Sequence, residues 1–175
     1  MARIIALCFF GITRSLRHTV ASIEKNIITP ARQVGPVRVY SHFFLQSDIV
    51  NPRSGESGIL NLTEHKFLPN DWIVLEEPDL CLKEWDFEVL KSYGDFWNDD
   101  FRSLRNLVHQ QHSLRKVTLA ALEDGVDICV FCRPDLYYHD SLVGPMRHAV
   151  RASDDLVQLP YWQPNTGLND RFAIC

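Results

Sequence analysis

The chain has 175 residues, of which 46% are hydrophobic, and its formal net charge is −4. This length and apolar content allow one domain with a buried core and exclude a disordered chain. The acidic balance does not predict a nucleic-acid surface, so an anionic ligand would need a local cluster of arginines.

The five cysteines are odd in number and irregularly spaced, which argues against a disulfide framework. Cys129 and Cys132 form a C-x-x-C pattern, but they lie in an apolar run. Residues three apart on a strand point to opposite faces, so we interpret the pair as small buried hydrophobic residues. The apolar N-terminal run is too short to span a membrane and lacks a signal-peptide cleavage site. We therefore predict free thiols, no membrane span and a cytoplasmic location.

Residues 3–10 form an apolar run that predicts a first, buried strand. A turn at residues 11–15 follows, in which Thr13 or Ser15 can cap the next helix. Apolar residues at helical spacing predict that helix, and Pro30 is expected to stop it. A strand, loop and helix in this order open a doubly wound α/β fold.

Further along, the pattern predicts two more strands and a long helix. Residues 37–44 and 71–75 are expected as strands, and the polar residues 46–58 as a loop. The acidic and aromatic stretch 80–100 predicts irregular structure or one short helix. Its aromatic rings could stack on a base or sugar, or cover the sheet edge. Residues 101–123 carry the apolar stripe of one long helix.

The last part predicts a strand at residues 128–132, a helix at 141–151, a short strand at 156–159 and a loop at 160–167. We find no internal repeat and no linker. The order of elements predicts an α/β fold, in which a mostly parallel, twisted sheet is flanked by helices.

Ligands of such sheets bind beyond the carboxyl ends of the strands. At the first strand end, Gly11 permits close backbone approach, and the helix that follows favours a phosphate. Arg14 could add a bidentate contact. The loop has neither the three-glycine dinucleotide fingerprint nor the lysine of a P-loop. The alternative is a plain turn with a solvated arginine.

The strand at residues 128–132 ends in Arg133-Pro134-Asp135. Proline fixes its own backbone and restricts Arg133, which makes a rigid elbow. Asp135 could bind a divalent metal, with a nucleotide diphosphate completing the coordination shell. The alternative is that Asp135 pairs with Arg133 or caps a turn.

Two other polar groups are weaker candidates. Asn169 and Asp170 signal a turn, and Arg171 can simply pair with Asp170. Another polar set, on the predicted long helix, is interpreted as a solvated face: Gln110, Gln111, His112 and Lys116. The histidines are scattered, and no zinc-ligand spacing stands out.

Six blocks follow one another along the chain: Gly11-Ile-Thr-Arg-Ser, Ser22-Ile-x-x-Asn26, Val39-Tyr-Ser-His42, Gln110-Gln-His-Ser-Leu114, Val130-Phe-Cys-Arg-Pro-Asp-Leu136 and Gly167-Leu-Asn-Asp-Arg-Phe-Ala173. In this order the sequence resembles a group of glycosyltransferase-like proteins with a Rossmann-like GT-A fold, found near polysaccharide genes, in large viruses and in eukaryotes. The resemblance spans nearly the whole chain, and the R-P-D-L and N-D-R-F-A blocks are its most specific parts.

The resemblance implies a site that binds a nucleotide-sugar donor and passes the sugar to a glycan or other acceptor, as in polysaccharide biosynthesis. The donor-binding residues are then expected to be Gly11, Thr13, Arg14, Arg133 and Asn169. The catalytic residues are expected to be Asp135 and Asp170, with Asp135 also the ligand of Mn²⁺ or Mg²⁺.

Two departures from the family pattern bear on this expectation. Metal-dependent members have an aspartate–any–aspartate motif, whereas this chain has Asp135-Leu-Tyr137, so the second carboxylate is missing. The family domain also continues past N-D-R-F-A, so residues 1–175 are expected to form a single GT-A-like domain without the acceptor-side elements. The expected function is glycosyl transfer. The alternative is a non-catalytic, degenerate GT-A-like domain that binds a nucleotide sugar or a partner.

Overall fold

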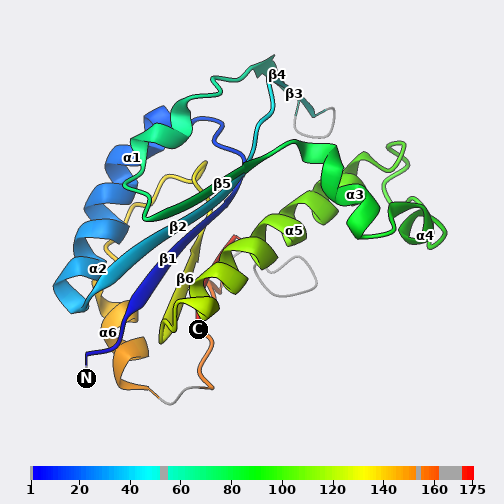
Figure 1. Ribbon diagram of the computed structural model, residues 1–175. Helices are drawn as coiled ribbons and strands as arrows, with labels where there is room; N and C mark the ends of the chain where they lie inside the picture. Colours follow the sequence, from blue (N-terminus) through cyan, green and yellow to red (C-terminus); the bar gives the residue numbers. More distant parts are fainter. Residues whose placement is uncertain (1, 52–54, 153–154, 162–170) are drawn as a thin grey trace.

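A five-stranded sheet forms the centre of the computed structural model, with the strand order β5-β2-β1-β6-β7 (Figure 1). Strands β1 (Ile5–Gly11), β2 (Val37–Phe44), β5 (Trp72–Glu76) and β6 (Ile128–Cys132) run parallel. The edge strand β7 (Phe172–Ile174) is antiparallel to β6. The predicted α/β class with a mostly parallel sheet is confirmed. The structure describes residues 2–51, 55–152, 155–161 and 171–175.

Helices cover both faces of the sheet (Figure 1). One face carries α1 (Leu16–Ile23), the π-helical turn η1 (Glu24–Ile28), α2 (Thr29–Val34) and α6 (Val143–Arg151). The other face carries the long helix α5 (Arg102–Glu123). A parallel sheet needs this double cover because both of its faces are apolar.

Alternate residues of β1 belong to two separate hydrophobic clusters. Ile5, Leu7 and Phe9 pack in the cluster that includes α1, α2 and α6, and all three are fully buried. Ala6 and Cys8 pack in the cluster on α5. The apolar run at residues 3–10 therefore has the burial of a central strand, as its sequence predicted.

Pro30 does not end the first helix, and that prediction was wrong. The helical path continues through the π-turn η1 into α2, where Pro30 occupies the first turn. A missing N–H is tolerated at that position, and a π-turn often accommodates such an interruption.

The predicted loop at residues 46–58 contains a hairpin of β3 (Asp48–Asn51) and β4 (Glu56–Ile59). The two strands are short and only partly apolar, and they pair with each other rather than with the main sheet. Strand formation here depends on that pairing, which the local pattern does not reveal.

The stretch at residues 80–100 was expected to be irregular or to form one short helix. The structure has several short helical segments there: η3 (Pro78–Leu80), α3 (Cys81–Glu84) and α4 (Phe87–Lys91). Another short piece, η2 (Glu64–Phe67), precedes β5. Residues 156–159 were expected to form a strand, but they make one isolated bridge, between Gln158 and Ile174.

The cysteines described in the structure are free, and Cys175 alone among them is exposed. Cys129 lies in the cluster on α5 and Cys132 in the cluster on α1, so the two thiols do face opposite sides of the sheet. Within the described residues, no helix is both long and apolar enough to cross a membrane.

Candidate functional site

The chain runs outward from β1 to β2 and β5, and then returns to β6 on the other side of β1. The carboxyl ends of β1 and β6 are therefore the switch point of the sheet, where ligands bind in folds of this kind. A pocket of about 580 Å³ opens there, and Arg14, Arg133 and Arg171 are among its lining residues. We call it the arginine pocket.

Asp135 organises two of these arginines. Its Oδ2 accepts hydrogen bonds from Arg14 Nε at 2.9 Å and Arg133 Nη2 at 2.6 Å, and its Oδ1 accepts one from Arg133 Nε at 2.9 Å. Burial by itself raises the pKa of the Asp135 carboxyl, but the hydrogen bonds and charge of Arg133 and the charge of Arg14 outweigh burial, so the pKa lies below its usual value. Asp135 is thus an ionised anchor that holds both guanidinium groups in place.

Polar side chains on the buried face of the first helix fix the elbow that carries Asp135. The Thr19 hydroxyl donates to the carbonyl oxygen of Pro134 at 2.6 Å. Ser22 Oγ accepts the N–H of Tyr138 at 3.1 Å, and the Asn26 side-chain amide donates to the Tyr138 carbonyl at 2.6 Å. The loop after β6 is therefore held at several backbone groups, which limits where the arginines can move.

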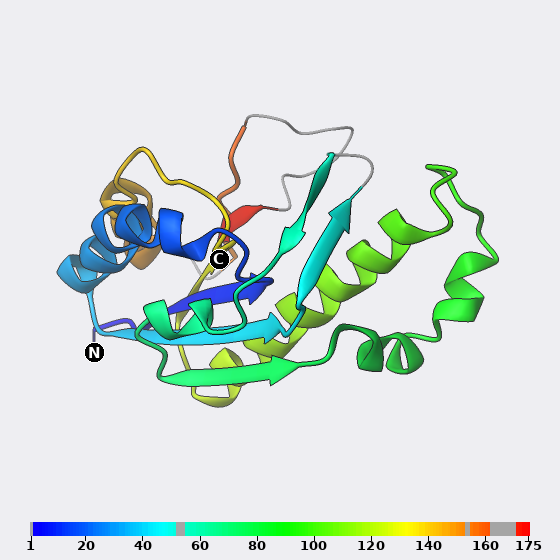
Figure 2. The same ribbon diagram turned by 90° about the horizontal axis from the view of Figure 1, so that it is seen from above.

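The hairpin β3–β4 forms another wall of the pocket, beyond the carboxyl ends of β1 and β2 (Figure 2). From β4, Glu56 Oε2 accepts a hydrogen bond from Arg14 Nη1 at 2.5 Å. The described lining residues include the guanidinium groups of Arg14, Arg133 and Arg171 together with the carboxylates of Asp135 and Glu56. Guanidinium groups gathered at one pocket favour an anionic ligand.

Aromatic rings complete the pocket. Phe44 at the end of β2, His109 on α5 and Trp97 all line it, and the rings of Phe44 and His109 lie 5.0 Å apart. Burial is the main reason that the pKa of His109 lies below its usual value, so its imidazole is uncharged at neutral pH. The site can thus offer both guanidinium groups and apolar ring faces to one ligand.

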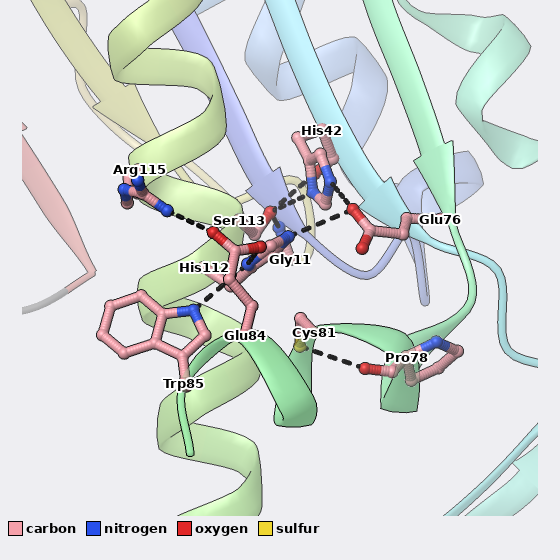
Figure 3. A network of polar contacts seen from close by, with 10 residues as sticks. All are labelled: Gly11, His42, Glu76, Pro78, Cys81, Glu84, Trp85, His112, Ser113 and Arg115. Carbon is pink, nitrogen blue, oxygen red and sulfur yellow. Dashed lines mark hydrogen bonds and ion pairs between the residues drawn. The ribbon is translucent and has the colours of Figure 1, made fainter. Parts of the chain in front are cut away.

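A second polar cluster lies at the ends of β2 and β5, against α5: His42, Glu76 and His112 (Figure 3). We call it the histidine cluster. Glu76 Oε2 lies 2.9 Å from His42 Nε2 and 3.1 Å from His112 Nε2. Both histidine side chains are fully buried, whereas the Glu76 side chain is 20% exposed. These three residues could hold a metal ion.

The partners of the two rings decide where their protons lie. The Trp85 indole N–H, which can only donate, faces His112 Nδ1 at 3.2 Å, so His112 carries its proton on Nε2 and donates to Glu76. Burial lowers the pKa of His42, so its imidazole is neutral, and its Nε2–H also donates to Glu76. Burial opposes ionisation of Glu76, but the hydrogen bonds from both histidines lower its pKa overall.

Some of the predicted donor-site residues line the arginine pocket and others do not. Gly11, Arg14, Arg133 and Asp135 line the arginine pocket together, while Thr13 is not among its lining residues. Thr13 instead accepts the Leu16 N–H through its backbone carbonyl at 3.0 Å. Neither predicted capping hydroxyl caps α1, because Ser15 occupies the N-cap position with a left-handed backbone and without a side-chain hydrogen bond. The predicted Asn169 and Asp170 lie outside the described residues.

Four residues of importance were missed or misread from the sequence. His112 was assigned to a solvated face, but it is completely buried, because α3 and β2 pack against α5. Glu56 lies in a segment expected to be a loop. His42 and Glu76 come from neighbouring parallel strands, so the pairing of β2 with β5 was the signal that could have joined them.

The sequence matches no protein-family model, and neither a curated protein nor a solved structure shows significant similarity to it.

Proposed function

We propose that the arginine pocket binds the diphosphate of a nucleotide-sugar donor, and that the protein is a GT-A-like glycosyltransferase. The observation that carries the proposal is the placement of Arg14 and Arg133 at the switch point of the sheet, both held by Asp135. Arginine forks suit phosphate oxygens, and Arg171 lines the same pocket.

The aromatic lining supports the nucleotide part of the proposal. Trp97, which is 55% exposed, offers a ring face on which a base can stack beside the buried Phe44, and a pocket of about 580 Å³ is of the size that small-molecule ligands need. The base would lie toward these rings, while the diphosphate would lie toward Arg14 and Arg133.

The arginines would also serve the chemistry. When the bond between the anomeric carbon and the diphosphate oxygen breaks, negative charge develops on the leaving group, and positioned guanidinium groups stabilise it. His109 is the candidate base for the acceptor hydroxyl, because it lines the pocket as a neutral imidazole.

Asp135 does not fit the part of a metal ligand. Both of its oxygens accept hydrogen bonds from guanidinium groups, and its side chain is 7% exposed, so a cation would have to displace an arginine. The arginines would supply the positive charge that Mn²⁺ or Mg²⁺ otherwise provides to balance the diphosphate. We therefore propose donor binding that depends on arginine rather than on Asp135-bound metal.

The test is calorimetric titration with UDP- and GDP-sugars, with and without Mn²⁺, together with an assay of donor hydrolysis. We expect binding of at least one donor, and Arg14→Gln or Arg133→Gln should weaken it about tenfold or more, since each removes a charge-assisted contact. Arg147→Gln is the control, because Arg147 is exposed on α6 outside the pocket lining. Equal loss in the control, or no binding of any nucleotide, would refute the proposal.

A second function, a non-catalytic nucleotide-sugar-binding domain, is favoured by one observation. Among the described lining residues, both carboxylates are engaged in ion pairs with arginines. Binding without any donor hydrolysis or transfer would support this module. Hydrolysis that His109→Gln abolishes at unchanged donor affinity would support the enzyme.

A further inference from the structure

We propose that the histidine cluster is a binding site for a transition-metal dication of the Zn²⁺ class, separate from the arginine pocket. The two imidazoles and the carboxylate come from β2, β5 and α5, and their ligand atoms all lie within 4.8 Å of one another. Two nitrogens and one carboxylate oxygen suit Zn²⁺, whereas Mg²⁺ prefers an all-oxygen shell.

Two of the three distances between ligand atoms are already close to those of a tetrahedral metal site. In a tetrahedral site with metal–ligand bonds of about 2.0–2.1 Å, neighbouring ligand atoms lie about 3.3 Å apart. Glu76 Oε2 is already 2.9 Å from His42 Nε2 and 3.1 Å from His112 Nε2. These two distances require shifts of only a few tenths of an ångström, and the two imidazole ligand nitrogens, which lie within 4.8 Å of each other, would close toward the same spacing around the ion. The partly exposed Glu76 leaves a side from which water can supply a fourth ligand.

Metal binding requires that each Nε2 gives up its proton, and the surroundings can take each ring in its other tautomer. For His42, the proton moves to Nδ1, which lies 3.0 Å from Ser113 Oγ. Ser113 Oγ can then accept a hydrogen bond from His42 Nδ1–H, because its own hydroxyl can donate to the His42 carbonyl oxygen at 2.8 Å. For His112, Glu84 Oε2 lies 3.6 Å from Nδ1.

Both rings would then have the second partner that metal-bound histidines need. Glu84 is itself held by Arg115 Nη1, which lies 2.5 Å from Glu84 Oε1. Each proton moves within its own ring, so the exchange is balanced without loss of a proton from either histidine.

Trp85 opposes this exchange (Figure 3). Its indole N–H donates a hydrogen bond to His112 Nδ1 and so stabilises the metal-free tautomer, in which the proton of His112 is on Nε2. Trp85 follows directly after the short helix α3 and is half-buried. It must turn away from Nδ1 before Glu84 can accept a hydrogen bond from the Nδ1–H group. Removal of the indole N–H should therefore strengthen metal binding, an effect that general destabilisation of the protein would not produce.

The experiment uses the full chain without a polyhistidine tag, treated with a chelator and titrated with ZnCl₂, CoCl₂ and MgCl₂ by calorimetry. We expect one Zn²⁺ per chain, visible absorption bands of four-coordinate Co²⁺, and no comparable Mg²⁺ binding. Glu76→Gln should weaken Zn²⁺ binding at least tenfold, because it removes the anionic ligand. His148→Gln, at an exposed histidine of α6, is the matched control and should leave the affinity unchanged.

Two further variants test the tautomer exchange. Trp85→Phe should bind Zn²⁺ several-fold more tightly than wild type, and Glu84→Gln should bind it about tenfold more weakly, as loss of a second partner does. Zn²⁺ affinity that is equal in wild type and Glu76→Gln, or absence of stoichiometric Zn²⁺ binding, would overturn the proposal. So would weaker binding by Trp85→Phe when circular dichroism shows that it is folded.

Discussion

At the scale of single residues, Asp135 is a partner of two arginines, whereas its motif suggested a metal ligand. The sequence offered a metal ligand, a partner of Arg133 or a turn cap, and the structure shows the partner of Arg133 and adds Arg14 from the other strand end. A carboxylate with two guanidinium partners is a stable anchor, because the ion pairs and hydrogen bonds offset its desolvation. If the arginine pocket binds a ligand as proposed, the arginines rather than Asp135 would contact it.

The first prediction concerns the charge of Asp135. Asp135→Asn should lower the free energy of unfolding by about 1–3 kcal/mol at neutral pH, because two partly buried guanidinium groups lose their counter-charge. The folded-state pKa of Asp135 is depressed, so its contribution is complete above the unfolded pKa of about 3.9 and is lost as the pH falls through the folded pKa.

Urea denaturation across pH measures this effect. The difference between wild type and Asp135→Asn should shrink as the pH falls below about 4. Asp79→Asn, which removes an exposed partner of Arg105, is the control and should give a much smaller loss. A difference that does not change between neutral and acidic pH would contradict the assignment.

The second prediction concerns Glu56, which forms an ion pair with Arg14 from the β3–β4 hairpin. If the pocket binds a diphosphate, that anion competes with the Glu56 carboxylate for the same guanidinium. Glu56→Gln should therefore tighten nucleoside-diphosphate binding several-fold, measured by calorimetry at low salt, where surface electrostatics are least screened. Weaker binding by Glu56→Gln would mean that Glu56 orients Arg14 instead of competing with the ligand.

At the scale of elements, α5 joins the two polar sites of the protein. Ser113 on α5 accepts the N–H of Gly11 at 2.8 Å and lies within hydrogen-bonding distance of His42. Gly11 has a left-handed backbone with φ of +106°, so β1 turns into the pocket loop at this point. One buried hydroxyl on the helix therefore fixes both the start of that loop and a member of the histidine cluster.

The third prediction tests this link. Ser113→Ala should cost about 1–3 kcal/mol of stability, because the Gly11 N–H loses its partner next to a fully buried side chain. Native-state hydrogen exchange should show faster exchange of the Gly11 amide than in wild type. Thr118→Ala on the same helix removes a hydroxyl that donates to the Leu114 carbonyl within α5, and it should leave the Gly11 amide unchanged.

At the scale of the whole molecule, the three layers depend on a central strand that is apolar on both sides. Phe9 is completely buried, whereas Phe96, near the short helix α4, is 86% exposed. A phenylalanine thus contributes much to the free energy of unfolding at position 9 and little at position 96, since this contribution follows the apolar area removed from water.

The fourth prediction compares these two positions. Phe9→Ala should lower the free energy of unfolding by about 3–5 kcal/mol, through lost burial and the cavity left between the sheet and α1. Phe96→Ala should change it by less than about 0.5 kcal/mol. Thermal and urea denaturation measure both, and a large loss from Phe96→Ala would show that its exposed ring packs against something in solution.

Local patterns by themselves determined most of the layers. The double-sided apolar run of β1, the stripe of α5 and the proline elbow at residues 133–135 each specify their own structure, because burial and backbone restriction act within a few residues. They also placed Arg14 and Asp135 at two strand ends, and parallel pairing brought those ends together.

Only the tertiary structure decided the rest. The pairing of β2 with β5, and the packing of α3 against α5, buried His112 and set it beside His42 and Glu76. The pairing of two short strands with each other turned an expected loop into the hairpin that places Glu56 beside Arg14. These contacts join residues tens of positions apart, and the free energy of such contacts belongs to the packed arrangement rather than to any local stretch.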